Sequence, residues 1–262
     1  MSRAFEKLAA AIARKDFVIF DNDGVTYSVT PEMHAQCHHA SARAAREILP
    51  HLTYAEAHRT AIESCRLHNN STQLFVARHG ADEAALHKAY HRNASLSPCL
   101  IAPDEALAKK FDHFHLPYAM LTQADRVWAV TALTQSTLRR HFPDHRIYAS
   151  EDVHHHKKWE SPAPFLQVLI SEGFQPHRAI MVEDTIANLV HAKAIGMMTI
   201  LVCGDNRLHP DQHPHVDFQV KNLSEFLDAA ALAAELIASC RLHPRMPQEN
   251  ATKRLILPVP YA

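Results

Sequence analysis

Short apolar segments rich in β-branched and aromatic residues recur along the chain. They occupy residues 17–20, 117–122, 146–149, 179–184 and 198–202, with a weaker example at 216–220. Each segment is too short for a core helix, and none alternates cleanly between apolar and polar residues. This pattern is typical of strands that are covered on both faces, as in a parallel sheet between two layers of helices. We therefore predict strands at these positions.

Helical segments separate the strands from residue 117 onward. The segments are 124–142, 161–173 and 185–196, and the last two each close with a glycine. Glycine is favoured just past the end of a helix because it adopts the left-handed conformation without strain. The alternation of strands and helices predicts βαβ units, and hence an α/β fold with a parallel sheet.

A long helical region interrupts this alternation after the first strand. Residues 31–113 form one helical segment after another and contain no strand-like run. The final segment carries four prolines and is typical of a tail laid over a surface. The predicted organisation is an α/β core domain of residues 1–30 and 114–240, a helical cap of 31–113 and a C-terminal tail of 241–262.

Composition and charge exclude several classes of function. The chain has 262 residues, of which 47% are hydrophobic and 21% charged, as is usual for soluble globular proteins. A net charge of −1 argues against a nucleic-acid polymer as partner. No apolar stretch approaches the roughly 18 residues that a membrane helix needs, and the N-terminus lacks a signal-peptide core. The five cysteines form no CxxC pair, which predicts reduced thiols and a cytoplasmic location. No oligomeric state is predicted.

Polar residues used in phosphoryl transfer follow the predicted strands where each strand ends. They are Asp21 and Asp23 after the first strand, with the turn residue Gly24 behind them, Thr122 after the second, Lys157 and Lys158 after the third, and Glu183 and Asp184 after the fourth. Open parallel sheets bind ligands outside the carboxyl ends of their strands, so these residues are expected to meet. A pair of aspartates alone is more typical of a turn, and the ordered set favours a site.

The chemistry of such a site would be phosphoryl transfer to a carboxylate. Asp21 would attack phosphorus and form an aspartyl-phosphate, while Asp23 would protonate the leaving alkoxide and then activate water. A carboxylate approaching a phosphate dianion requires a cation between them. We expect Mg²⁺, held by Asp21, the backbone carbonyl of Asp23 and Asp184, with Glu183 as a further candidate ligand.

The phosphoryl oxygens of the substrate need donors of their own. We expect them from the hydroxyl of Thr122, from its neighbour Gln123 and from one lysine ammonium. Lys158 and Lys157 compete for this role, and Lys158 is favoured because it lies nearer the start of the following helix. The expected partner is a small-molecule phosphomonoester.

The ordered motifs resemble those of the haloacid dehalogenase superfamily of phosphohydrolases. The resemblance covers roughly residues 16–225 and includes the DxDG[TV] motif as Asp21 to Val25, together with the stretch VEDTIANLVHAKAIGM from Val182. It implies a Rossmann-like, doubly wound parallel sheet and a Mg²⁺-dependent phosphatase. The position of the helical insert implies a cap of the C1 type and a likeness to the pyrimidine 5′-nucleotidase-like group, which acts on nucleoside 5′-monophosphates.

Three alternatives remain open on the sequence. A phosphosugar mutase would use the same groups and retain the phosphoryl group for a second acceptor. A 2-haloacid dehalogenase needs neither a second carboxylate acid/base nor a metal, so Asp23, Glu183 and Asp184 count against it. A non-catalytic relative would be expected to lack at least one of these groups.

Overall fold

The strands form one six-stranded sheet in which every neighbouring pair is parallel. The computed structural model describes residues 2–68, 70–95, 101–204 and 213–242. The strand order is β3-β2-β1-β4-β5-β6, that of a doubly wound α/β fold. The strands are β1 (Phe17–Phe20), β2 (Tyr118–Leu121), β3 (Ile147–Tyr148), β4 (Ala179–Glu183), β5 (Met198–Val202) and β6 (Phe218–Val220). The predicted fold class and the positions of all six strands are confirmed.

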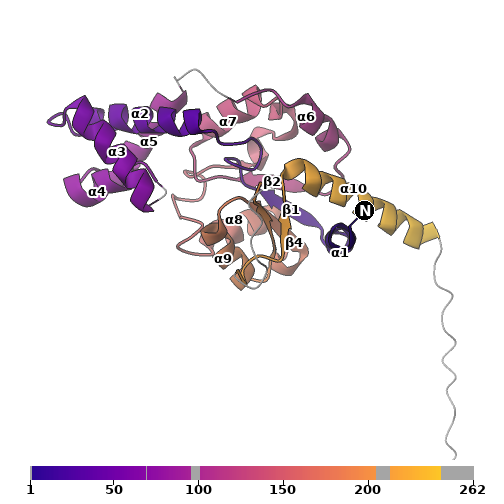
Figure 1. Ribbon diagram of the computed structural model, residues 1–262. Helices are drawn as coiled ribbons and strands as arrows, with labels where there is room; N and C mark the ends of the chain where they lie inside the picture. Colours follow the sequence, from indigo (N-terminus) through magenta and orange to yellow (C-terminus); the bar gives the residue numbers. More distant parts are fainter. Residues whose placement is uncertain (1, 69, 96–100, 205–212, 243–262) are drawn as a thin grey trace, which may run out of the picture.

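Helices cover both faces of the sheet (Figure 1). Side chains alternate between faces along a strand, so Val18 and Phe20 lie in one apolar cluster and Phe17 and Ile19 in the other. The first face packs on α1 (Arg3–Ile12), α6 (Glu105–Asp112), α7 (Arg126–Gln135) and α10 (Leu223–Leu242). The second packs on α8 (Ala163–Glu172) and α9 (Ile186–Ala194). This double cover explains the nearly continuous apolar strands.

Phe20, the last residue of β1, lies at the centre of an aromatic cluster. Its ring centroid is 5.6 to 6.3 Å from five others, those of Phe111, Phe114, Tyr118, Phe142 and Phe226. These mostly edge-to-face contacts come from four different parts of the chain and are favourable beyond their buried area. The end of β1 is therefore firmly held.

The helical insert divides into two parts. Its first four helices are α2 (Pro31–Ile48), α3 (Tyr54–His68), α4 (Gln73–His79) and α5 (Glu83–Ser95), and they pack around an apolar cluster of their own. They lie to one side of the sheet in Figure 1. We name α2 to α5 the cap helices.

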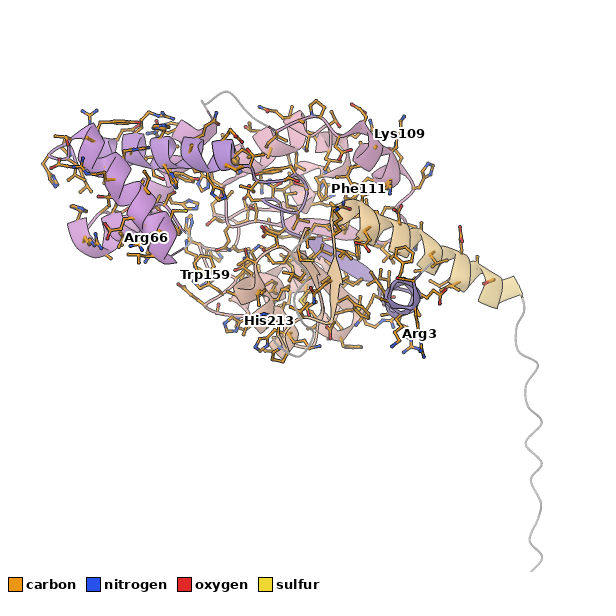
Figure 2. The ribbon with its side chains drawn as sticks, in the orientation of Figure 1. Arg3, Arg66, Lys109, Phe111, Trp159 and His213 are labelled. Carbon is orange, nitrogen blue, oxygen red and sulfur yellow. The ribbon has the colours of Figure 1, made fainter. Side chains whose placement is uncertain are left out.

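The fifth helix of the insert, α6, belongs with the core instead. Its Leu107, Ala108 and Phe111 lie in the cluster under the first face of the sheet, and Lys110 forms an ion pair with Asp228 of α10 at 2.5 Å. Phe111 is labelled in Figure 2. The sequence placed α6 in the cap because helical periodicity does not reveal which core a helix packs against.

The helix that follows β2 is shorter than the sequence predicts. A single helix was predicted over 124–142, but α7 ends at Gln135, Thr137 takes a left-handed φ of 65°, and a 3₁₀ turn (Arg139–His141) follows. This turn lets Leu138 and Phe142 reach the core, which a continuous helix would not allow.

Of the predicted tail, 243–262 lies outside the described residues. None of the described helices is long and apolar enough to span a membrane.

The cap helices contact the core through α5. His87 Nε2 lies 3.0 Å from the carbonyl oxygen of Gln123, the residue after Thr122. The buried His91 lies with its Nδ1 3.9 Å from the carboxylate of Asp125. Burial, and next the neighbouring His87, hold the pKa of His91 well below its usual value of 6.5.

This depressed pKa predicts a loss of stability in mild acid. Below about pH 6.5 the unfolded chain protonates the imidazole of His91 while the folded chain does not, so stability falls by up to about 1.4 kcal/mol per pH unit. Urea unfolding of wild type and His91→Gln at pH 7.5 and 5.5 should show a smaller acid loss for the variant. The same change at the exposed His177 is the control, and equal acid losses in both variants would contradict the account.

Candidate active site

The site lies where the strand order reverses, between β1 and β4. Phe20 pairs with Val182 in the sheet, so Asp21 and Glu183 follow side by side. Asp21 continues the alternation of Phe17 and Ile19, which places its side chain on the face covered by α8 and α9. The backbone N–H of Asp21 donates to the carbonyl of Val182 at 2.9 Å, which fixes the start of the loop.

A buried lysine joins the two acidic strand ends. Lys158 Nζ lies 2.8 Å from Asp21 Oδ1 and 2.5 Å from Glu183 Oε2, and it donates a longer bond of 3.4 Å to the carbonyl of Leu121 at the end of β2. An ammonium has three protons, and here each has an acceptor. Lys158 and Glu183 are fully buried and Asp21 is only 6% exposed.

Burial and charge act together on the ionisation of this group. Burial, followed by repulsion from Glu183, raises the pKa of Asp21 to about 7. Burial alone would lower the pKa of Lys158, but attraction to Asp21 and Glu183 outweighs it and the pKa is raised. The lysine is therefore charged at neutral pH.

The donor set at this point fits a divalent metal ion. Carboxylate oxygens of Asp21, Glu183 and Asp184 all lie within 4.8 Å of one another, and Asp184 is exposed to solvent. Three carboxylates face one ammonium, so the cluster carries surplus negative charge. Hard oxygen ligands with surplus negative charge are what Mg²⁺ and Ca²⁺ bind.

Gly24 lets the loop after β1 approach Asp184. Its φ is +77°, and a Cβ at this position would lie 2.0 Å from Asp184 Oδ2. Only glycine satisfies both the left-handed backbone and the close contact. The sequence motif thus places Asp21, Asp23 and Asp184 around one small space.

Asp23 is held by two aromatic side chains. Trp128 Nε1 donates to Asp23 Oδ1 at 2.7 Å, and the hydroxyl of Tyr27 donates to the same oxygen. Burial, and next the charge of Asp21, raise the pKa of Asp23. Sequence reasoning missed both aromatic residues. The signal for Trp128 was an N–H-bearing ring in the first turn of the helix that follows β2.

Thr122 and Gln123 lie directly beyond β2. Thr122 is fully buried, and its hydroxyl oxygen accepts a bond of 3.1 Å from the backbone N–H of Ala124. The side-chain nitrogen of Gln123 donates to the carbonyl of His156 at 3.4 Å, and its Oε1 is buried with no protein donor among the described residues. Thr122 thus directly follows Leu121, whose carbonyl accepts a bond from Lys158.

Lys157 is placed elsewhere. Its Nζ lies 3.4 Å from a carboxylate oxygen of Glu83 on α5 and 6.0 Å from the ring centroid of Trp159. Trp159 is 41% exposed and labelled in Figure 2. Of the two competing lysines, the structure brings Lys158 to Asp21 and directs Lys157 to the cap.

A cavity of about 710 Å³ opens beside the acidic cluster. Gly24, Tyr27, His34, Asp104 and Asp184 are among its lining residues. Its volume lies in the range of small-molecule sites, roughly 300–1,000 Å³. The cavity meets the acidic cluster at Asp184, which belongs to both.

Comparison with known proteins identifies the family of this chain. Residues 15–196, more than half of the chain, match the family model of the haloacid dehalogenase-like hydrolases. The chain belongs to this hydrolase family. None of the curated proteins searched matches it.

Solved structures share the fold at low sequence identity. CbbY from Rhodobacter sphaeroides, in complex with phosphate, is 19% identical with a TM-score of 0.57, covering 82% of this chain and 99% of that one. A family IA, variant 3 hydrolase from Entamoeba histolytica is 17% identical with a TM-score of 0.57, covering 84% and 99%. A phosphatase from Thermococcus onnurineus is 18% identical with a TM-score of 0.55, covering 81% and 96%.

Gly24→Ala tests whether the contact with Asp184 organises the site. Gly173 is a matched control, because its φ is also +77° but a Cβ there would meet nothing within 4 Å. Alanine at either position should cost about 1–3 kcal/mol of backbone strain. Gly24→Ala should lose roughly a further 1–3 kcal/mol from the steric clash. Chemical denaturation measures both, and equal losses would contradict a packed contact at Gly24.

Proposed function

We propose that this hydrolase is a Mg²⁺-dependent phosphatase acting on a small phosphomonoester. The observation that carries the proposal is the buried ammonium of Lys158, which lies 2.8 Å from Asp21 and 2.5 Å from Glu183 beside the carboxylate of Asp184. A nucleophile, a cationic phosphate anchor and a set of metal ligands then share one strand-end site.

Asp21 is the nucleophile in this proposal. Its free carboxylate oxygen forms a bond to phosphorus as the bond from phosphorus to the leaving oxygen breaks. Asp23 gives its proton to the leaving oxygen, which departs as the alcohol. In the second half, Asp23 takes a proton from water, the water oxygen bonds to phosphorus, and the bond from phosphorus to Asp21 breaks to release phosphate.

Other residues bind and orient the phosphoryl group. Lys158 and the hydroxyl of Thr122 stabilise the charge on its oxygens, with Gln123 beside them. Glu183 holds Lys158 in place through the 2.5 Å contact and is itself buried, which favours this role over direct metal ligation.

Asp21, Asp184 and the backbone carbonyl of Asp23 would hold Mg²⁺, while Glu183, the further candidate ligand on the sequence, would hold Lys158 instead. The ion, when bound, would neutralise the repulsion between the Asp21 carboxylate and the phosphate dianion. The fit rests on the surplus of carboxylates over ammonium in the cluster.

The cap helices α2 to α5 would cover the leaving group and exclude water during transfer.

A nucleoside 5′-monophosphate is the substrate that the sequence resemblance favours, and the cavity admits a small molecule. The ordered support of Asp23 by two donors favours a phosphatase or mutase over a dehalogenase, which needs no such acid. The described cysteines Cys37 and Cys65 are free thiols, which supports a cytoplasmic location.

Asp21→Asn should abolish hydrolysis of 4-nitrophenyl phosphate, with kcat falling by at least about 10³-fold, because the amide is a poor nucleophile. Asp16→Asn makes the same change directly before the first residue of β1, at the end of the strand away from the site, and this variant should retain activity. Chelation with EDTA should stop the wild-type reaction and added Mg²⁺ should restore it. Activity that survives Asp21→Asn would remove Asp21 as nucleophile, and activity that survives EDTA would remove the metal.

Lys158→Ala and Lys157→Ala should differ sharply. Loss of the buried ammonium removes the phosphate anchor and should lower kcat by about 10²–10³-fold. Loss of Lys157 removes its contacts with Glu83 and the ring of Trp159 and should change kcat by less than about threefold, as is usual for partly exposed ion pairs. Steady-state kinetics of both variants tests this, and similar losses in the two variants would exclude a distinct role for Lys158.

A further inference from the structure

Tyr27 and Trp128 converge on one oxygen of Asp23. The indole N–H of Trp128 points at Asp23 Oδ1 at 2.7 Å and at the hydroxyl oxygen of Tyr27 at 3.2 Å. The hydroxyl of Tyr27 donates to the same Asp23 oxygen. The three side chains form a closed triangle of hydrogen bonds between the loop after β1 and the first turn of α7.

This triangle distinguishes the two oxygens of the carboxyl group. Oδ1 accepts two bonds, whereas none of the described residues donates to Oδ2. A proton on the carboxyl group therefore resides on Oδ2, since Oδ1 has its acceptor sites occupied by donors. The triangle fixes both the rotation of the carboxyl group and the oxygen that carries the proton.

The two donors are themselves held in place. Tyr27 and Trp128 pack against a small apolar cluster of Met33, Ile101 and Ala132. The backbone N–H of Trp128 donates to the carboxylate of Asp125, which caps α7, at 2.9 Å.

The residue next to that cap ties α7 to the sheet. The guanidinium of Arg126 donates to the carbonyl of Ile147, the first residue of β3, at 2.8 Å, and pairs with Asp152 at 2.5 Å. The first turn of α7 is thus anchored to the core, and Trp128 is a rigid support rather than a surface side chain.

We propose that Tyr27 and Trp128 are positioning residues that orient Asp23, so that its Oδ2 faces the leaving oxygen of the substrate. This inference rests on the proposed phosphatase function. Neither residue touches the reacting atoms, and each acts through Asp23. Proton transfer depends on the alignment of donor and acceptor, and a displacement of about 1 Å can cost about 10²-fold in rate.

A purely structural role would be to satisfy a half-buried carboxylate, and it makes a different prediction. Loss of a structural bond lowers stability and affects all substrates equally. Loss of an orienting bond affects substrates in proportion to their need for proton donation. Leaving groups that are poor without protonation should suffer most.

The first experiment detects the bond without measuring activity. The chain has two tryptophans, so the indole region of a ¹H–¹⁵N spectrum of the full-length protein contains two signals. Trp159→Phe assigns them. Asp23→Ala should shift the Trp128 indole signal upfield and leave that of Trp159 in place. A Trp128 signal that does not move on Asp23→Ala would overturn the proposal.

The second experiment compares leaving groups. In Tyr27→Phe and Trp128→Phe, kcat with phenyl phosphate should fall about 10- to 100-fold, and with 4-nitrophenyl phosphate less than about threefold, at nearly unchanged KM. Tyr118→Phe is the matched control, because its buried hydroxyl donates to the carbonyl of His141 at 2.9 Å, away from the site. This control should change both rates equally.

Equal losses with the two substrates, or no loss with either, would overturn the positioning role. Failure of the proposed function looks different, because wild type would then hydrolyse neither phosphate. Should Trp128→Phe fail to fold, Tyr27→Phe keeps the ring and decides the question alone. Thermal unfolding of each variant establishes that it is folded before rates are compared.

Discussion

The ion cluster around Lys158 is the interaction on which the rest of this structure depends. It joins the ends of β1 and β4 through Asp21 and Glu183, and it contacts the end of β2 through the carbonyl of Leu121. A buried ammonium costs several kcal/mol unless acceptors surround it, and removal of one partner leaves an uncompensated charge. The cluster therefore couples three strand ends and the loop before α8, and a change in any one of them disturbs the others.

The packing behind the cluster explains how its charged groups are held so close together. Phe20 is enclosed by five aromatic rings, so the residue after it has little freedom. Gly24 turns the chain back toward Asp184 where no other residue fits. The carboxyl group of Asp23, in the same loop, is fixed by hydrogen bonds from Tyr27 and Trp128. The site is therefore held firmly on its core side.

The strands and the ordered carboxylates could be predicted from the sequence, because buried parallel strands are short apolar runs and their ends gather at one edge of a sheet. The choice between the two lysines could not be settled by counting. His154 and His155 both have left-handed φ values, 54° and 59°, and the N–H of His155 returns to the carbonyl of Ser150. The loop folds back on itself, so sequence spacing does not give the distance from β3 to Lys158.

Other features depend on tertiary contacts that no local pattern contains. The assignment of α6 to the core follows from what Phe111 touches, and the support of Asp23 by Trp128 links residues 105 positions apart. The end of α7 at Gln135 follows from the burial of Leu138 and Phe142 and not from a helix-breaking residue.

The most direct test of the central claim is to trap the covalent phosphoryl group. The reaction is quenched with acid during turnover of a phosphomonoester in Mg²⁺, the protein is reduced with borohydride, and its peptides are mapped by mass spectrometry. An aspartyl-phosphate at the Lys158 cluster predicts homoserine in place of aspartate at position 21 and at no other aspartate. Turnover without any such conversion, or conversion at another carboxylate, would contradict the account.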